Sequence, residues 1–160
     1  MKTSLGIWAF GAMATRFVPG GYKPELAGET TVQRVRRAID ELGDLIDGYE
    51  FHYPQELSED NLGEVRDALD GHDVYCIATG LHLDPLFGKG GVVSPDAGVR
   101  AEARRRTVAA ADFAGEIGAH FIVWPGSRAT TTRSRRRTER AGRGSWKESA
   151  RPRSAAAGTA

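Results

Sequence analysis

Residues 45–79 read LIDGYEFHYPQELSEDNLGEVRDALDGHDVYCIAT and hold the pattern from which the fold follows. Residues 45–53 are rich in apolar and aromatic side chains and predict a strand, which Pro54 ends because proline has no N–H for a sheet ladder. Ser58 can cap the helix that follows, in which apolar residues recur every three or four positions. Residues 73–79 predict a second strand. This order indicates two parallel strands joined by a crossover helix.

The same alternation continues on both sides of this unit. Before it, residues 3–10 predict a strand and residues 30–43 a helix; after it, residues 95–118 predict a helix and residues 119–124 a strand. We therefore expect an α/β fold of about four parallel strands with three crossover helices. No glycine-rich nucleotide-binding pattern follows any strand. A complete (β/α)8 barrel needs about 250 residues and the chain has 160, so we predict a partial TIM barrel, or else a small open sheet.

Residues 127–160 differ from the rest of the chain in charge and composition. They carry nine arginines and one lysine against two glutamates, a net charge of +8, which leaves −7 for residues 1–126. They contain no Leu, Ile, Val, Met or Phe, and Trp146 is their one aromatic residue. Such a segment cannot bury enough apolar surface to offset its ordering entropy. We predict a folded domain over residues 1–126 and a disordered basic tail over residues 127–160.

Composition also limits the redox chemistry and the compartment. The single cysteine, Cys76, excludes an internal disulfide, and its apolar surroundings favour a packed thiol over a nucleophile. The apolar stretch after Lys2 is short and broken by glycines, which is unlike a signal peptide. No apolar run approaches the roughly 18 residues that a membrane helix needs. We expect a cytoplasmic protein with no membrane partner.

The carboxyl ends of the predicted strands hold the candidate functional residues, because parallel barrels place their working side chains there. Glu50 and His52 are two positions apart and therefore share one face of their strand. Aromatic rings beside polar groups suit a sugar, whose apolar ring faces stack on aromatics while its hydroxyls meet polar atoms. The candidates at these ends are Trp8, Phe10, Glu50, His52, His82 and Trp124.

Short motifs along residues 3–126 resemble, in the same order, those of xylose isomerases. Gly6-Ile7-Trp8 resembles their Gly-Leu-Trp on the first strand, and Phe51-His52 resembles their Phe-His at the end of the second. Residues 81–91 resemble the loop after their third strand, and residues 114–119 followed by Val123-Trp124 resemble a helix end and the fourth-strand tryptophan. The chain is therefore similar to the N-terminal half of the wider xylose isomerase-like TIM barrel superfamily.

This resemblance implies a sugar isomerase or epimerase, an intramolecular oxidoreductase acting on a small sugar. It implies that His52 assists opening of the sugar ring, that Trp8, Phe10 and Trp124 form an apolar wall, and that Glu50, His82 and Asp84 are polar contacts. Members of the family bind a divalent metal, Mg, Mn or Co, through side chains on strands five to eight. This chain has no such strands, so we expect no metal ligand among its residues and little activity from the chain alone.

The chain also departs from the family's pattern. Xylose isomerases follow the histidine of the second strand with acidic residues, one of which orients the imidazole, whereas Tyr53, Pro54 and Gln55 follow His52. By this comparison the orienting carboxylate is missing. A half barrel would also expose two sheet edges and an apolar face, and we expect it to self-associate.

The tail and the superfamily leave three hypotheses open. One choice of codons for residues 127–138 reads, one base out of frame, as a balanced segment rich in aromatic residues, as in a folded domain. A single-base deletion near codon 127 would therefore explain the tail, and sequencing the gene through that codon tests this hypothesis. Arginine runs bind phosphate backbones, so the tail could instead bind nucleic acid. The barrel could also belong to the endonuclease-IV-like branch, a metal-dependent DNA repair fold, although its net charge of −7 disfavours a DNA-binding surface.

Overall fold

The computed structural model describes residues 2–12, 19 and 21–124. The basic tail predicted over residues 127–160 therefore lies outside the described residues. Among the described residues, contacts divide the chain into two compact units, one of residues 2–80 with 105–124 and the other of residues 81–104.

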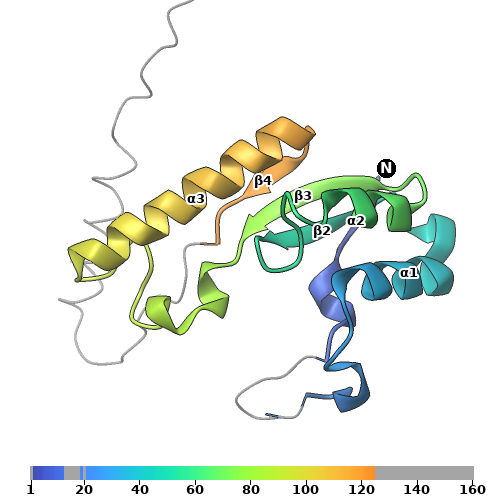
Figure 1. Ribbon diagram of the computed structural model, residues 1–160, viewed down its shortest axis with the longest axis horizontal. Helices are drawn as coiled ribbons and strands as arrows, with labels where there is room; N and C mark the ends of the chain where they lie inside the picture. The colour runs from blue at the N-terminus through green and yellow to red at the C-terminus, as the bar shows by residue number, and fades with distance from the viewer. Residues whose placement is uncertain (1, 13–18, 20, 125–160) are drawn as a thin grey trace, which may run out of the picture. The chain divides into compact units, whose positions relative to one another are not determined.

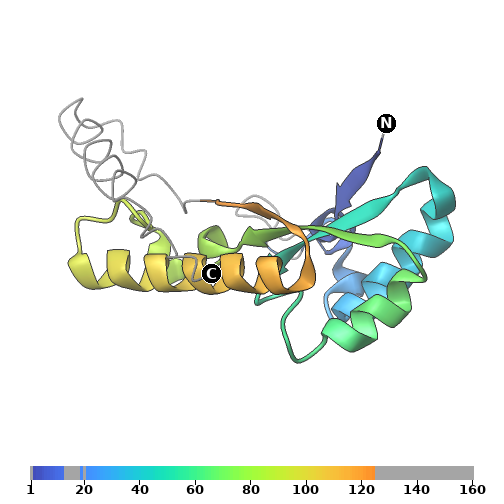
Figure 2. The same cartoon turned by 90° about the horizontal axis from the view of Figure 1, so that it is seen from above.

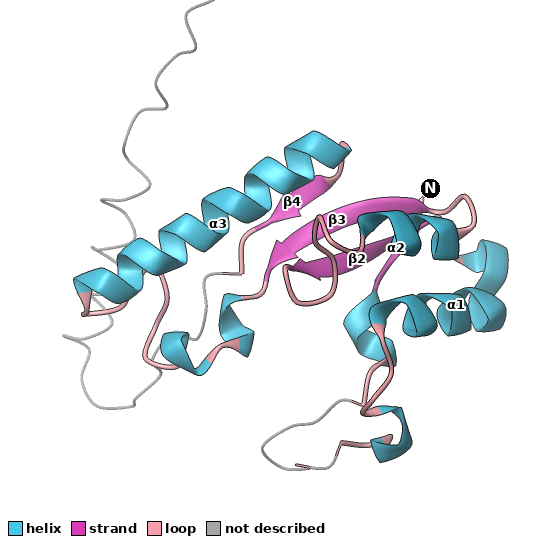
Figure 3. Cartoon of the chain, in the orientation of Figure 1, coloured by secondary structure: helices cyan, strands magenta, loops and turns pink. Residues whose placement is uncertain are grey.

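Four parallel strands form one sheet in the first unit (Figures 1 and 3). They are β1 (Ser4–Gly6), β2 (Gly48–Tyr53), β3 (Asp73–Thr79) and β4 (His120–Ile122), and they lie in the sheet in the order in which they occur in the chain. All three pairings are parallel, with Gly6 opposite Glu50, His52 opposite Ala78, and Cys76 opposite His120. The parallel α/β sheet predicted from the alternation of elements is confirmed.

Three α-helices connect these strands: α1 (Thr31–Leu42), α2 (Leu62–Leu69) and α3 (Ala97–Ile117). A capping box starts α1, where the hydroxyl of Thr30 accepts from the backbone N–H of Gln33 and the Gln33 side chain accepts from the N–H of Thr30. No helix in the described part of the chain is long and apolar enough to cross a membrane.

The first strand and the second helix are both shorter than the sequence predicts. β1 ends at Gly6, and residues 7–10 form a 3-10 helix instead of continuing the strand. Ser58 does not cap α2: its N–H donates to Oδ1 of Asn61 at 2.9 Å, and Nδ2 of Asn61 donates to the carbonyl of Glu56 at 3.0 Å. These bonds close a turn in the loop, so the helix begins only at Leu62.

One face of the sheet carries the main core. Tyr49, Phe51 and Ile77 are fully buried on β2 and β3, and they pack against apolar side chains from α1, α2 and α3. Figure 2 shows α1 and α2 on the same side of the sheet. Because side chains alternate along a strand, the opposite face of β2 carries Glu50 and His52.

The second unit has a small core of its own. Two 3-10 helices, Leu81–Leu83 and Pro85–Phe87, precede α3. Leu81 and Phe87 are buried with Ala103, and the partly buried valines at positions 92 and 99 pack against them.

The main core predicts a clear contrast between two leucines. Leu69 at the end of α2 is 1% exposed, whereas Leu45 before β2 is 73% exposed. We expect Leu69→Ala to lower the free energy of unfolding by about 2–5 kcal/mol, since it removes buried methyl groups and leaves a cavity. Leu45→Ala should change it by less than about 0.5 kcal/mol. Urea unfolding followed by circular dichroism measures both, and equal effects would contradict this packing of α2 against the sheet.

A second prediction concerns Cys76, which is buried on β3. Burial, reinforced by the nearby Glu50 carboxylate, raises the pKa of this thiol from 9.0 to about 11. The resulting stabilisation is fully present below pH 9, the pKa of the unfolded thiol, and is lost as the pH rises through the folded pKa. We expect a thiol reagent to modify Cys76 slowly in the folded chain near pH 8 and rapidly in urea. Fast labelling of the folded chain would show that the thiol is accessible.

Candidate functional site

Three aromatic rings meet at the carboxyl ends of the strands. Trp8 follows β1, His52 lies near the end of β2, and Trp124 follows β4. The ring centroids are 4.3 Å apart for Trp8 and His52, 5.5 Å for His52 and Trp124, and 5.7 Å for Trp8 and Trp124. β1 and β4 are the two outer strands of the sheet, so side chains that follow the outer strands converge over its carboxyl end. His52 is 2% exposed, whereas Trp124 is 37% exposed.

Gly6 makes room for one of these rings. A Cβ atom at this position would overlap the six-membered ring of the Trp8 indole. The backbone of Gly6 is extended, with φ −71° and ψ 119°. The glycine is therefore required by the close approach of the indole rather than by its own backbone conformation.

Glu56 supplies the carboxylate that orients His52. Its Oε2 accepts from Nδ1 of His52 at 3.0 Å and from the backbone N–H of His52 at 2.9 Å. After β2 the main chain turns back, and the N–H groups of Glu56 and Leu57 both donate to the carbonyl of His52. A carboxylate only accepts hydrogen bonds, so Nδ1 carries the hydrogen and Nε2 is the basic nitrogen of the neutral ring. The expectation that an orienting carboxylate is missing was therefore wrong.

Arg34 of α1 balances the charge of Glu56. Its Nη1 donates to Oε1 of Glu56 at 3.2 Å, while Oε2 of the same carboxylate holds His52. Glu56 is only 8% exposed, and a carboxylate so deeply buried needs a counter-charge. The imidazole, the carboxylate and the guanidinium thus form a connected group that leads from β2 to α1.

Two other predicted residues, Glu50 and Phe10, contact side chains outside the group formed by Trp8, His52 and Trp124. Glu50, on the same strand face as His52, accepts a hydrogen bond from Ser4 at 2.6 Å. Phe10 lies against α1, with the guanidinium carbon of Arg37 5.8 Å from its ring centroid. Its carbonyl also accepts from Nη2 of Arg37 at 2.7 Å. Phe10 therefore helps to anchor α1, while Glu50 remains a polar group on the face that carries His52.

His82 and Asp84 belong to the unit of residues 81–104. His82 is exposed on the 3-10 helix Leu81–Leu83. Asp84 accepts from the N–H of Leu86 at 2.8 Å and so caps the next 3-10 helix. This is the ordinary role of an aspartate before a turn.

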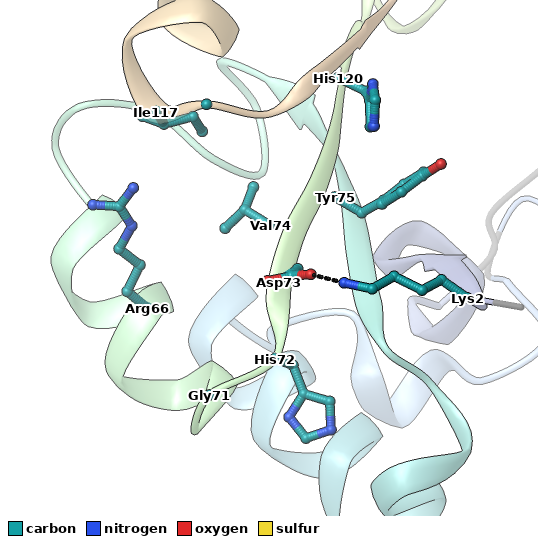
Figure 4. Close-up of a pocket in the computed structure, with 10 residues that line it drawn as sticks. Lys2, Arg66, Gly71, His72, Asp73, Val74, Tyr75, Ile117 and His120 are labelled. Carbon is teal, nitrogen blue, oxygen red and sulfur yellow. Dashed lines mark hydrogen bonds and ion pairs between the residues drawn. The ribbon is translucent and has the colours of Figure 1, made fainter.

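A hollow of about 560 Å³ lies at the opposite, amino-terminal end of the strands. Figure 4 shows its lining, in which Asp73 at the start of β3 pairs with Lys2 at 3.1 Å. His72 lies here with Nδ1 2.7 Å from the carbonyl of Leu69 and Nε2 3.4 Å from that of Gly43, so its ring lies between the ends of α2 and α1. In parallel barrels this end serves stability, and we assign the hollow no catalytic role.

The described residues do not fit a catalytic divalent metal. Within residues 2–12, 19 and 21–124, no group of three or more His, Cys, Asp or Glu side chains could hold such an ion. The carboxylate nearest His52, that of Glu56, is already engaged by His52 and Arg34. No chemical step is therefore assigned to a metal on this chain.

Sequence reasoning missed Glu56 and Arg34. Glu56 follows His52 by four positions, but Pro54 lies between them and rules out the helical spacing that would have linked the two. Arg34 belongs to a predicted helix, where an arginine off the apolar face is ordinarily a solvated residue. The signal that could have pointed to them was His52 itself. A buried histidine needs a hydrogen-bond partner for its Nδ1, and a buried carboxylate that serves as this partner needs a counter-charge.

A substitution that adds one methyl group at position 6 tests the contact between Gly6 and Trp8. We expect Gly6→Ala to displace the indole, to lose the Trp8 ring-current shift on the ring protons of His52, and to cost about 1–3 kcal/mol of stability through overpacking. Gly28→Ala is the matched control, because nothing lies within 4 Å of the added Cβ. Proton NMR of the histidine rings measures the shift, and an unchanged His52 signal in Gly6→Ala would refute the packing.

Comparison with known proteins agrees with this geometry. The family model of the xylose isomerase-like TIM barrel matches residues 37–155, well over half of the chain. A xylose isomerase of Thermus thermophilus is 41% identical over 64 residues, a segment that covers 38% of this chain and 16% of that protein. The matched segment is thus a small part of that relative. Four parallel strands joined by helices and the family match lead to one conclusion: the chain belongs to the xylose isomerase-like TIM barrel family.

Proposed function

We propose that this chain is part of a sugar isomerase or epimerase and that His52 transfers a proton during opening of the sugar ring. The observation that carries the proposal is the placement of His52, whose ring is held by Glu56 and contacts Trp8 and Trp124 at the carboxyl ends of the strands. In barrels of this kind substrates bind at that end. Membership of the family supports the same class of activity.

The chemistry of ring opening fits the orientation of the histidine. When a cyclic sugar opens, the bond between the anomeric carbon and the ring oxygen breaks, the anomeric hydroxyl loses a proton and the ring oxygen gains one. With Nδ1–H donated to Glu56, Nε2 is the atom of His52 that can accept or deliver such a proton. The carboxylate would stabilise the imidazolium that forms while the proton resides on the ring.

The two tryptophans would bind the apolar face of the sugar. Trp124 offers an indole that is 37% exposed, and the Trp8 indole lies against both Trp124 and His52, with ring centroids 5.7 Å and 4.3 Å away. Aromatic faces pack well against the C–H groups of a sugar ring. We further propose Phe10 as part of this wall and Glu50 as a polar contact for the hydroxyl groups. The polar contacts predicted for His82 and Asp84, which belong to the unit of residues 81–104, stay predictions.

We assign the step that follows ring opening to none of the described residues. The family generally uses divalent metals, and the described residues provide no set of ligands for one. The segment shared with the Thermus thermophilus enzyme covers 16% of that enzyme. We therefore propose that the 160-residue chain binds a sugar but has little isomerase activity by itself.

Charge favours a sugar over a nucleic acid as the ligand. The endonuclease-IV-like branch shares the barrel, but a DNA-binding surface requires positive charge. Residues 1–126 carry a net charge of −7. Two indoles beside a buried histidine suit a small ring better than a phosphate backbone, so we retain the sugar as the substrate.

NMR titration of the full chain tests the proposal. We expect D-xylose and related aldoses to shift the indole N–H signals of Trp8 and Trp124, assigned with Trp8→Phe and Trp124→Phe. Glycerol, which has hydroxyl groups but no ring, should shift none of them. His52→Gln should retain the sugar-induced shifts, since the proposal places its role in chemistry rather than in stacking. Shifts caused by duplex DNA but by no sugar would refute it.

A further inference from the structure

Arg34 lies between two carboxylates beneath the candidate site. Its Nη1 is 3.2 Å from Oε1 of Glu56, and its Nε is 3.6 Å from Oε2 of Glu29. The side chain of Arg34 is 16% exposed, and those of Glu56 and Glu29 are 11% and 10% exposed. At this depth solvent screens the charges only weakly, so the three groups depend on one another.

Glu29 is itself firmly held. Nε and Nη2 of Arg37 each donate to one of its oxygens at 2.8 Å, and Nη2 also donates to the carbonyl of Phe10. These hydrogen bonds from Arg37, with the charge of Arg34, lower the pKa of Glu29. Glu29 is therefore a fixed anion that pairs with Arg34. The charged side chains form a series of contacts that runs from Arg37 through Glu29, Arg34 and Glu56 to His52.

We propose that Arg34 is a positioning residue that acts on His52 through Glu56. The two oxygens of Glu56 have different partners, since Oε2 accepts both hydrogen bonds from His52 and Oε1 accepts the one from Arg34. Arg34 thereby holds the carboxylate in the orientation that keeps the hydrogen of His52 on Nδ1. The inference rests on the proposed function for its purpose, but the geometry that carries it is independent of any substrate.

Loss of Arg34 has a definite chemical consequence. Oε1 of Glu56 would become a buried anion without its counter-charge, and such a group either turns toward water or takes up a proton. In the first case Nδ1 of His52 loses its acceptor. In the second, a protonated carboxyl group can donate to Nδ1 and move the ring hydrogen to Nε2. Both outcomes replace a single tautomer by a mixture or by the opposite tautomer.

The shape of arginine suits this position better than that of lysine. Nε and Nη1 belong to one rigid plane and face two different carboxylates, whereas a lysine offers a single ammonium group. Gly11 lies against the same guanidinium, where a Cβ atom would be 3.4 Å from Cζ of Arg34. We therefore expect Arg34→Lys to restore the effect only in part.

Histidine NMR on the ¹⁵N-labelled full chain tests the proposal. Correlation of ring protons with ring nitrogens distinguishes the two tautomers, and His52→Gln identifies the signals of His52. We expect the wild type to show the Nδ1–H tautomer, Arg34→Met to lose it, and Arg34→Lys to lie between them. Arg36→Met is the matched control, because Arg36 is exposed on the same helix. Arg34→Gln, which keeps a polar head without charge, replaces Arg34→Met if that variant does not fold.

The outcomes separate this inference from the proposed function. If Glu56→Ala alters the His52 signals and the neutral Arg34 variants do not, Arg34 has no positioning role and the inference is overturned. The proposed function, tested by sugar binding, then still stands. If the Arg34 variants change the tautomer but no sugar shifts the tryptophan signals, the positioning role stands and the proposed function fails. A change of equal size in Arg36→Met would reveal a general effect of helix charge and would also overturn the inference.

Discussion

The burial of one face of β2 and β3 against the helices is the constraint on which the rest of the structure depends. Tyr49, Phe51 and Ile77 are fully buried there. Since side chains alternate along a strand, burying Phe51 on the helix side sends His52 to the opposite face. The same packing sets the ends of the strands side by side, and so brings Trp8 and Trp124 to that histidine. The candidate site is thus a consequence of where the core lies.

Electrostatics then determine what the histidine can do. Without a partner at Nδ1, a buried imidazole could carry its hydrogen on either nitrogen. Glu56 removes that freedom, and Arg34 stabilises the charge of Glu56 at a place where water reaches neither side chain easily. The ion pairs that join α1 to the end of β2 therefore connect the helix layer of the fold to the chemistry of its strand ends. The ion pair between Lys2 and Asp73 differs from these buried pairs, because both side chains are exposed and such a pair stabilises the fold little.

Most of the fold could be predicted from local patterns. The strand around His52, the strand of residues 73–79 and the helix that begins after Thr30 were all predicted close to their observed bounds, because apolar periodicity and capping act over a few residues. The elements that were predicted wrongly also follow from local patterns, which carry no information about tertiary contacts. Residues 7–10 are as apolar as a strand, yet they turn into a 3-10 helix that directs Trp8 across Gly6. Ser58 had the chemistry of a helix cap but lies in a turn that Asn61 closes.

The sequence by itself determined the order of strands and helices, the family and the identity of the histidine and of the two tryptophans beside it. Only the tertiary structure decided which carboxylate orients that histidine. The residues just after His52 are not acidic, and the residue that serves, Glu56, reaches it because the chain reverses direction and donates two hydrogen bonds back to the His52 carbonyl. Arg34 is still further away in the sequence. Local periodicity carries no information about such contacts, because they depend on how elements pack in space rather than on residue spacing.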